Sequence, residues 1–170
     1  FGDVSGAFRL VPIPGPHGIG CADVNRRGTA LGWFGSTNLG LWDGGPRDLA
    51  TVLGYRGGGV FGQVRLNDHG EMAGTLTEGV TNRLFLHLPR NAYGLPAGFH
   101  VLANAVGRGI VVLDFSDAGA ILWYTTGPSS DLLLWSDRQS VPIRDLLPES
   151  APWVPAPIVP GNALRWSLND

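Results

Sequence analysis

Apolar and polar residues alternate over short stretches that recur along the chain, each followed by a turn rich in Asn, Asp and Gly. The last apolar residue before the turn is Val24, Leu66, Phe115 or Leu168. Two positions earlier the chain again carries an apolar residue, namely Ala22, Val64, Leu113 or Trp166. The position between them holds Asp23, Arg65, Asp114 or Ser167. An alternation of period two is typical of a β-strand with one buried face, so we expect four equivalent strands.

Each of these strands leads into a similar turn. The turn opens on Asn25, Asn67, Ser116 or Asn169, and the first three copies have a glycine three positions later. Asn favours turns because its amide hydrogen-bonds nearby main chain, and Gly accepts the left-handed conformation that tight hairpins need. The two residues between Asn and Gly differ freely among the copies. We therefore interpret them, Asp68 and His69 included, as turn surface rather than as acid–base chemistry.

Three further strands are predicted after each turn. The second strand covers residues 29–34, 71–77 and 120–125. A polar, Gly-rich loop separates it from a third strand at 39–42, 84–87 and 132–135. A fourth, more irregular strand is expected at 47–50, 92–95 and 141–146, where nearby prolines favour a sheet edge. Four short antiparallel strands in about 40–50 residues describe one blade of a β-propeller.

The spacing of the turns predicts how the repeats are arranged. Successive turn residues lie 42, 49 and 53 positions apart, and 26 positions separate Asn169 from Asn25 through the chain ends. We assign full repeats to residues 18–58, 59–102 and 103–160, and a split repeat to 161–170 plus 1–17. The predicted fold class is all-β, a single small β-propeller domain over 1–170 with about four blades. Closure of this ring requires residues 163–169 to pair with residues 3–8. The second interpretation is a segment of a larger propeller, and the third is a β-sandwich.

The repeated residues resemble those of the bacterial HAF-type short-repeat family. The first match joins residues 24–28 with 39–44 and 48–49, the second joins 66–70 with 84–86, and the third joins 115–119 with 133–135 and 145–146. His87 at the position of a Trp, Ser116 at the position of an Asn, and a short first unit depart from the family pattern. The resemblance implies a β-propeller, often in exported bacterial proteins, and it implies no reaction. An extracellular or cell-surface location is therefore favoured.

Composition narrows the classes of partner. Hydrophobic residues make up 44% of the chain, which excludes a disordered protein, and 26 Gly and 13 Pro suit a domain rich in turns. The net charge of −2 offers no basic surface for nucleic acid. No run approaches ~18 apolar residues, so no membrane span is expected. The one cysteine, Cys21, cannot form an internal disulfide and is interpreted as a buried, inert thiol.

The polar residues that stand between the two apolar positions of each first strand form the most distinctive group of charged side chains in the sequence. Arg65 is predicted to stand between Asp23 and Asp114, with Ser167 completing the set, because the first strand of a blade lies nearest the propeller axis. We interpret the set as an ion-pair ring that sets the register of the blades. An axial site for an anion, a cation or water is the alternative.

No catalytic, metal or cofactor site is predicted. The chain has no Gly-x-Ser-x-Gly motif, and its Gly-rich loop at residues 54–59 lacks the Lys-Ser/Thr of a phosphate loop. The four histidines show no zinc-site spacing, and one cysteine does not complete a thiolate site.

We predict a non-enzymatic scaffold that binds a protein or a glycan through its loops and rim. Trp33 and Tyr124 occupy equivalent positions beside the loop after the second strand, and Tyr55 and Arg56 lie at the tip of a loop between repeats. Aromatic and Arg side chains are enriched in binding hot spots, so these four are the predicted binding residues. One alternative is a hydrolase or lyase with an axial site, which requires two or more carboxylates or histidines within about 5–10 Å of one another. The other is a structural module of a larger exported protein.

Overall fold

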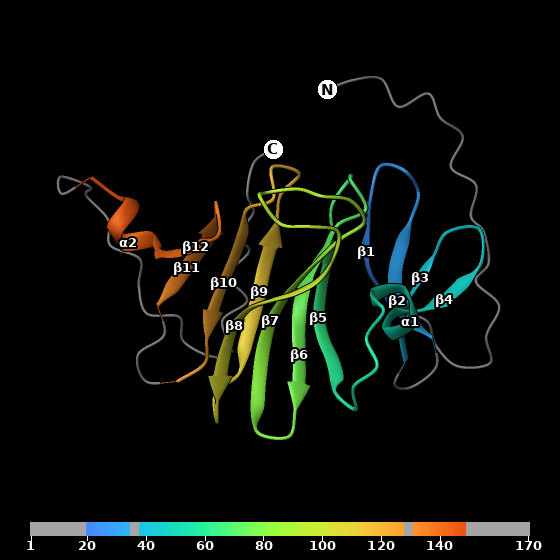
Figure 1. Cartoon of the computed structure of the whole chain (residues 1–170), viewed down its shortest axis with the longest axis horizontal. Helices are drawn as coiled ribbons and strands as arrows, with labels where there is room; N and C mark the ends of the chain where they lie inside the picture. Colours follow the sequence, from blue (N-terminus) through green and yellow to red (C-terminus); the bar gives the residue numbers. More distant parts are fainter. Residues whose placement is uncertain (1–19, 35–37, 128–130, 149–170) are drawn as a thin grey trace.

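The computed structural model describes residues 20–34, 38–127 and 131–148, and its strands form three four-stranded antiparallel sheets (Figure 1). The first sheet contains β1 (Gly20–Val24), β2 (Ala30–Phe34), β3 (Asn38–Trp42) and β4 (Pro46–Asp48) in that order. The second contains β5 (Val60–Leu66), β6 (Met72–Glu78), β7 (Thr81–Leu88) and β8 (Gly98–Val106). The third contains β9 (Ile110–Phe115), β10 (Ile121–Thr125), β11 (Leu132–Ser136) and β12 (Gln139–Pro142). The all-β prediction is confirmed.

The second sheet lies between the other two and is buried on both faces (Figure 1). Phe85 on one face packs with the first sheet and helix α1 (Leu49–Leu53), whereas Leu84 and Leu86 on the other face pack with the third sheet. Successive residues of a strand point to opposite faces, and both faces of this sheet are covered, so all three side chains are fully buried. The core is therefore divided into two layers, one on each side of the second sheet.

The fourth strand of each sheet differs from the prediction. At 47–50 and 141–146 the structure has a short strand followed by a helix, α1 in the first sheet and α2 (Ile143–Leu146) in the third. Helix α1 begins because the Asp48 side chain accepts a hydrogen bond from the Thr51 N–H at 2.9 Å, and it ends at Gly54 with φ 65°. Residues 92–95 form a turn, and the strand that pairs with β7 comes later, as β8.

Within the described ranges, no helix is long and apolar enough to cross a membrane.

The prediction that every first strand buries its apolar positions is wrong for β1. Leu66 and Phe115 are each 6% exposed, but Val24 is 60% exposed and Ala22 is also exposed. Leu66 and Phe115 face the preceding sheet, whereas Val24 lies on the face of the first sheet that points away from the second. Among the described residues no sheet covers that face. The predicted pairing of residues 163–169 with 3–8 lies outside the described residues, so closure of a four-bladed ring stays a prediction.

Candidate functional site

The hairpin turns of the three sheets are stacked on one another and joined by hydrogen bonds. We call residues 25–28, 67–70 and 116–119 the stacked turns. The Asn25 amide Nδ2 donates to the Asn67 carbonyl at 3.1 Å, and the Asn67 Nδ2 donates to the Ser116 carbonyl at 3.2 Å. In each turn the glycine has a φ between 78° and 84°, and its N–H donates to the carbonyl of the first turn residue. The turns therefore hold neighbouring sheets in register at one end of the stack.

The first of the two residues between Asn or Ser and Gly takes part in this stacking, which corrects the interpretation of Asp68 and its equivalents as turn surface. Asp68 accepts a hydrogen bond from the Arg26 N–H at 2.7 Å and forms an ion pair with the Arg26 guanidinium at 3.2 Å. Asp117 accepts from the Asp68 N–H at 2.7 Å. The sequence alone did not reveal this role, because the partner turns are 42 and 49 residues away.

Beside the stacked turns, the first and second sheets leave a hollow of about 350 Å³, which we call the inter-sheet groove. Its apolar lining consists of Leu41, Val52, Leu66 and Met72. Its remaining lining residues are Asn25, Arg27, Thr29, Asp43, Arg47, Gly70, His87 and Pro89. Polar and apolar residues contribute about equally to the lining, and the volume is at the lower end of the range of ligand pockets.

His87 explains why the groove is open. Strand pairing places His87 opposite Met72, just as it places Trp42 opposite Ala30 and Trp135 opposite Ile121. Trp135 is 3% exposed and closes the space between the second and third sheets. His87 lies on the same face of β7 as Phe85, towards the first sheet, and its smaller ring fills less of the equivalent space. The sequence marks His87 as a departure from the repeat, but the groove was not predicted from it.

The rim of the groove carries more positive than negative charge. Arg47 is paired with Asp43 at 3.4 Å, and both side chains are more than half exposed. Among the described residues Arg27 has no ion-pair partner. The Nδ1 atom of His87 is buried without a hydrogen-bond partner, and burial, with a smaller effect of His100, lowers the pKa of His87 below its ordinary value of 6.5. The imidazole is therefore neutral at neutral pH.

Trp33 and Tyr124 lie at the ends of β2 and β10 that are farther from the stacked turns, and Tyr55 is bonded to Glu78 at the corresponding end of β6. Trp33 is half-buried and lines a hollow of about 140 Å³ with residues of β5. The Tyr55 hydroxyl donates to the Glu78 carboxylate, and burial, followed by this hydrogen bond, raises the pKa of Tyr55. Arg56 is exposed, and Tyr124 is half-buried in the third sheet. The 140 Å³ hollow contains none of the other three residues, so the structure does not gather the four into it.

Among the described residues, Arg65 does not form the predicted ion pairs with Asp23 and Asp114. Asp23 accepts a hydrogen bond from the Leu66 N–H of the neighbouring strand at 2.9 Å. Asp114 accepts one from the Phe115 N–H at 2.9 Å. No ion pair within the described ranges involves Arg65, whose Nε atom is buried without a hydrogen-bond partner. Ser167 lies outside the described residues.

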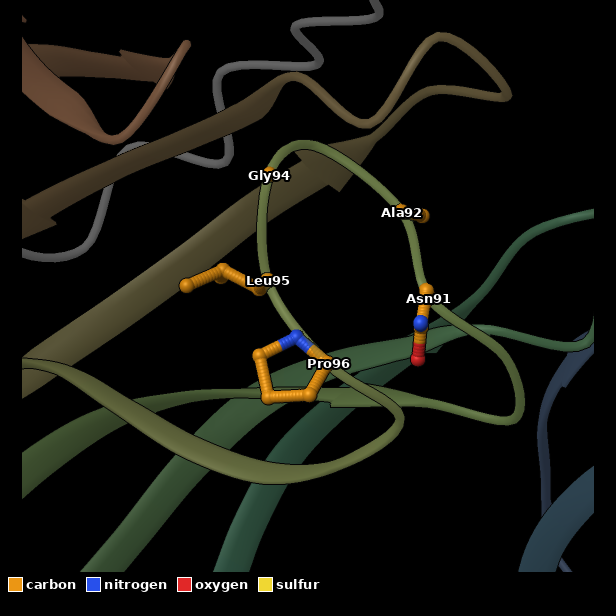
Figure 2. A pocket seen from close by; sticks show the side chains of 5 residues that line it. All are labelled: Asn91, Ala92, Gly94, Leu95 and Pro96. Atoms are coloured by element: carbon orange, nitrogen blue, oxygen red, sulfur yellow. The ribbon is translucent and has the colours of Figure 1, made fainter.

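A third hollow, of about 350 Å³, belongs to the loop after β7. Figure 2 shows it as the opening of this single loop, with Asn91 and Pro96 near its base and Gly94 at its tip. The loop is closed by paired hydrogen bonds between Ala92 and Leu95 at 3.0 and 2.8 Å. Small and apolar residues dominate its lining, and Asn91 is already bonded to the Ala97 N–H at 2.8 Å, so it offers few groups for recognition.

Comparison of the chain with protein-family models, with curated proteins and with solved structures gives no match. Among the described residues there is also no group of three or more His, Cys, Asp and Glu side chains that could hold a metal ion. The inter-sheet groove is therefore assessed on its own geometry.

Proposed function

We propose that this protein is a non-catalytic binding module that recognises a protein or glycan partner through grooves and rims of its stacked sheets. The observation that carries the proposal is the inter-sheet groove, with Leu66 and Met72 in its apolar lining and Arg27 and Arg47 beside them. Its walls belong to strands and to hydrogen-bonded turns, so the groove exists before a ligand arrives. Preorganised walls reduce the entropy lost on binding.

The chemistry of the groove supports binding rather than catalysis. Among the described residues that line the groove, Asp43 is the only carboxylate, and it is paired with Arg47. General acid–base catalysis needs a proton donor and acceptor placed on the reacting atoms, and glycosidases use two facing carboxylates. The groove is lined by one carboxylate, Asp43, and one histidine, His87, but the His87 Nδ1 atom is buried, and no second carboxylate lines the groove among the described residues. The alternative of a hydrolase or lyase would require an axial site elsewhere.

The scaffold in this proposal is a β-propeller. Its support is that three sheets with equivalent hairpins pack one on another, as successive blades do, and that the first strands β1, β5 and β9 are neighbours. A fourth blade built from both chain ends would complete the HAF-like ring. Trp33, Tyr55, Arg56 and Tyr124 then mark a second recognition surface at the end of the blades opposite the stacked turns.

A fragment screen by NMR tests the proposed function. Uniformly ¹⁵N-labelled protein is titrated with a library that contains sugars, amino-acid derivatives and small acids, and amide shifts are mapped. We expect shifts at Thr29, Met72 and His87, and we expect H87W to abolish them by filling the groove. Shifts confined to Trp33 and Tyr124 would move the site to the other end. A library without any specific shift at either end would refute the proposal.

A further inference from the structure

We propose that the inter-sheet groove binds an acidic segment of a protein partner, in which a carboxylate stands next to an aliphatic side chain. This inference rests on the proposed function and names its ligand class. The carboxylate would lie between Arg27 and Arg47, and the aliphatic side chain would lie on the apolar lining of the groove.

The two arginines of the first turn show why Arg27 is available to a ligand. Arg26 is paired with Asp68 of the next turn at 3.2 Å. Arg27 has no such partner among the described residues, although the turn holds its main chain, since its N–H donates to the Asn25 Oδ1 at 3.1 Å. A planar guanidinium on a fixed turn is suited to binding a carboxylate through two parallel hydrogen bonds.

Arg47 provides the second cation. Its pair with Asp43 is 3.4 Å long, and the side chains are 53% and 63% exposed. Exposed pairs of this kind contribute little free energy, and a guanidinium has five N–H donors, so Arg47 can bind a ligand carboxylate while it stays beside Asp43. Both guanidinium groups belong to lining residues of the groove, which gives its rim the charge that complements an acidic ligand.

The apolar lining favours a peptide over a sugar. Leu41, Leu66 and Met72 line the groove but are almost fully buried, whereas Val52 is half-buried and offers apolar surface to an aliphatic side chain. Among the described residues that line the groove there is no Trp, Tyr or Phe. A flat aromatic platform, to which the apolar face of a sugar ring could stack, is therefore missing. A volume of about 350 Å³ is enough for one anchoring side chain and its neighbour.

His87 lines the groove, and its neutral ring adds no charge to the lining. Its Nδ1 atom is buried without a hydrogen-bond partner, so a peptide in the groove does not reach it.

Two capped pentapeptides test the inference, one with the sequence alanine-leucine-aspartate-leucine-alanine and one with asparagine in place of aspartate. A short galacturonate oligomer is the third probe, and binding is followed by amide shifts of the labelled protein. We expect the aspartate peptide to shift Thr29, Met72 and His87 and to bind at least about tenfold more tightly than the asparagine peptide. R27E should weaken this binding by about tenfold or more. The control R26E, which breaks the ion pair with Asp68 at a residue that does not line the groove, should weaken it less than R27E does.

Each other outcome overturns the inference in a distinguishable way. Equal binding of the two peptides, or equal effects of R27E and R26E, would show that the groove does not recognise a carboxylate. The groove would then remain a binding site for a ligand of another class. Shifts caused by galacturonate alone would make the ligand a glycan and would preserve the proposed function. Binding of the aspartate peptide that survives H87W would place it outside the groove. R27E changes an exposed turn residue, so its result does not depend on whether H87W folds.

Discussion

The hydrogen bonds of Asn67 should contribute a large part of the stability of the stack. Asn67 is 4% exposed and belongs to the middle turn. Its Oδ1 accepts from the His69 and Glu71 N–H groups at 3.0 Å each, and its Nδ2 donates to the Glu71 carboxylate at 2.7 Å and to the Ser116 carbonyl at 3.2 Å. The substitution N67A removes all four bonds without adding a clash.

The expected cost follows from which groups lose their partners in buried surroundings. Glu71 is 1% exposed, so its N–H has no access to water once the Asn67 oxygen is gone. Its carboxylate keeps one donor, the Tyr93 hydroxyl at 2.6 Å. A buried N–H group without a hydrogen-bond acceptor costs about 1–3 kcal/mol. The Glu71 carboxylate also loses one of its two donors, and the hydrogen bond to the Ser116 carbonyl is lost. We therefore expect N67A to lower the free energy of unfolding by about 3–4 kcal/mol. This is a large fraction of the roughly 5–15 kcal/mol that stabilises a typical domain.

Urea unfolding followed by tryptophan fluorescence measures this cost through the linear dependence of the unfolding free energy on denaturant. N25A is the control, because the Asn25 Oδ1 accepts two equivalent hydrogen bonds within its own turn, from N–H groups that are only partly buried. We expect N25A to cost about 1–2 kcal/mol, since water can replace those bonds. N67S should fall between wild type and N67A, because Ser116 caps the third turn with one hydroxyl at 3.2 Å. An N67A cost below about 1 kcal/mol, or equal to that of N25A, would refute the burial argument.

Three further predictions concern the groove and the turns. H87W should raise the free energy of unfolding by about 0.5–2 kcal/mol because the larger ring fills the groove, whereas W135H should lower it by roughly 3 kcal/mol. Urea unfolding measures both changes. A destabilised H87W would contradict the equivalence of positions 87 and 135. Because the pKa of His87 is lower in the folded protein than its ordinary 6.5, the unfolded chain binds the proton more readily, so stability should fall as the pH drops below about 6.5. H87Q should lose this part of the pH dependence. Identical dependence of stability on pH in H87Q and the wild type would rule out His87 as its cause. G119A should cost more than G28A in thermal unfolding, because both glycines have a left-handed φ but only a Cβ at Gly119 would meet the Tyr93 ring; G28A should cost about 1 kcal/mol from the backbone alone.

Local signals in the sequence account for most of the elements. The hairpins follow from Asn or Ser and Gly at a spacing of three, because that turn is stabilised by its own amide, hydroxyl and main-chain groups. Helix α1 also had local signals, Asp48 before it and Gly54 after it, but the repeat pattern led to a strand prediction there. In the second sheet no helix follows the third strand; residues 92–95 form a turn, and the edge strand starts at Gly98.

The candidate site depended on the tertiary structure, because its walls come from different sheets. The sequence showed that His87 stands where Trp42 and Trp135 stand, but a hollow needs both the smaller side chain and a facing sheet. Arg26 and Arg27 are chemically identical neighbours, and only the position of Asp68, 42 residues away, decides which of them is paired. Val24 matches Leu66 in pattern but not in burial, since burial depends on what packs on the outer face. The sequence by itself determined which residues make strands and turns, through local hydrogen bonding and alternation; the stacking of the sheets decided which polar groups stay without partners and where a groove remains.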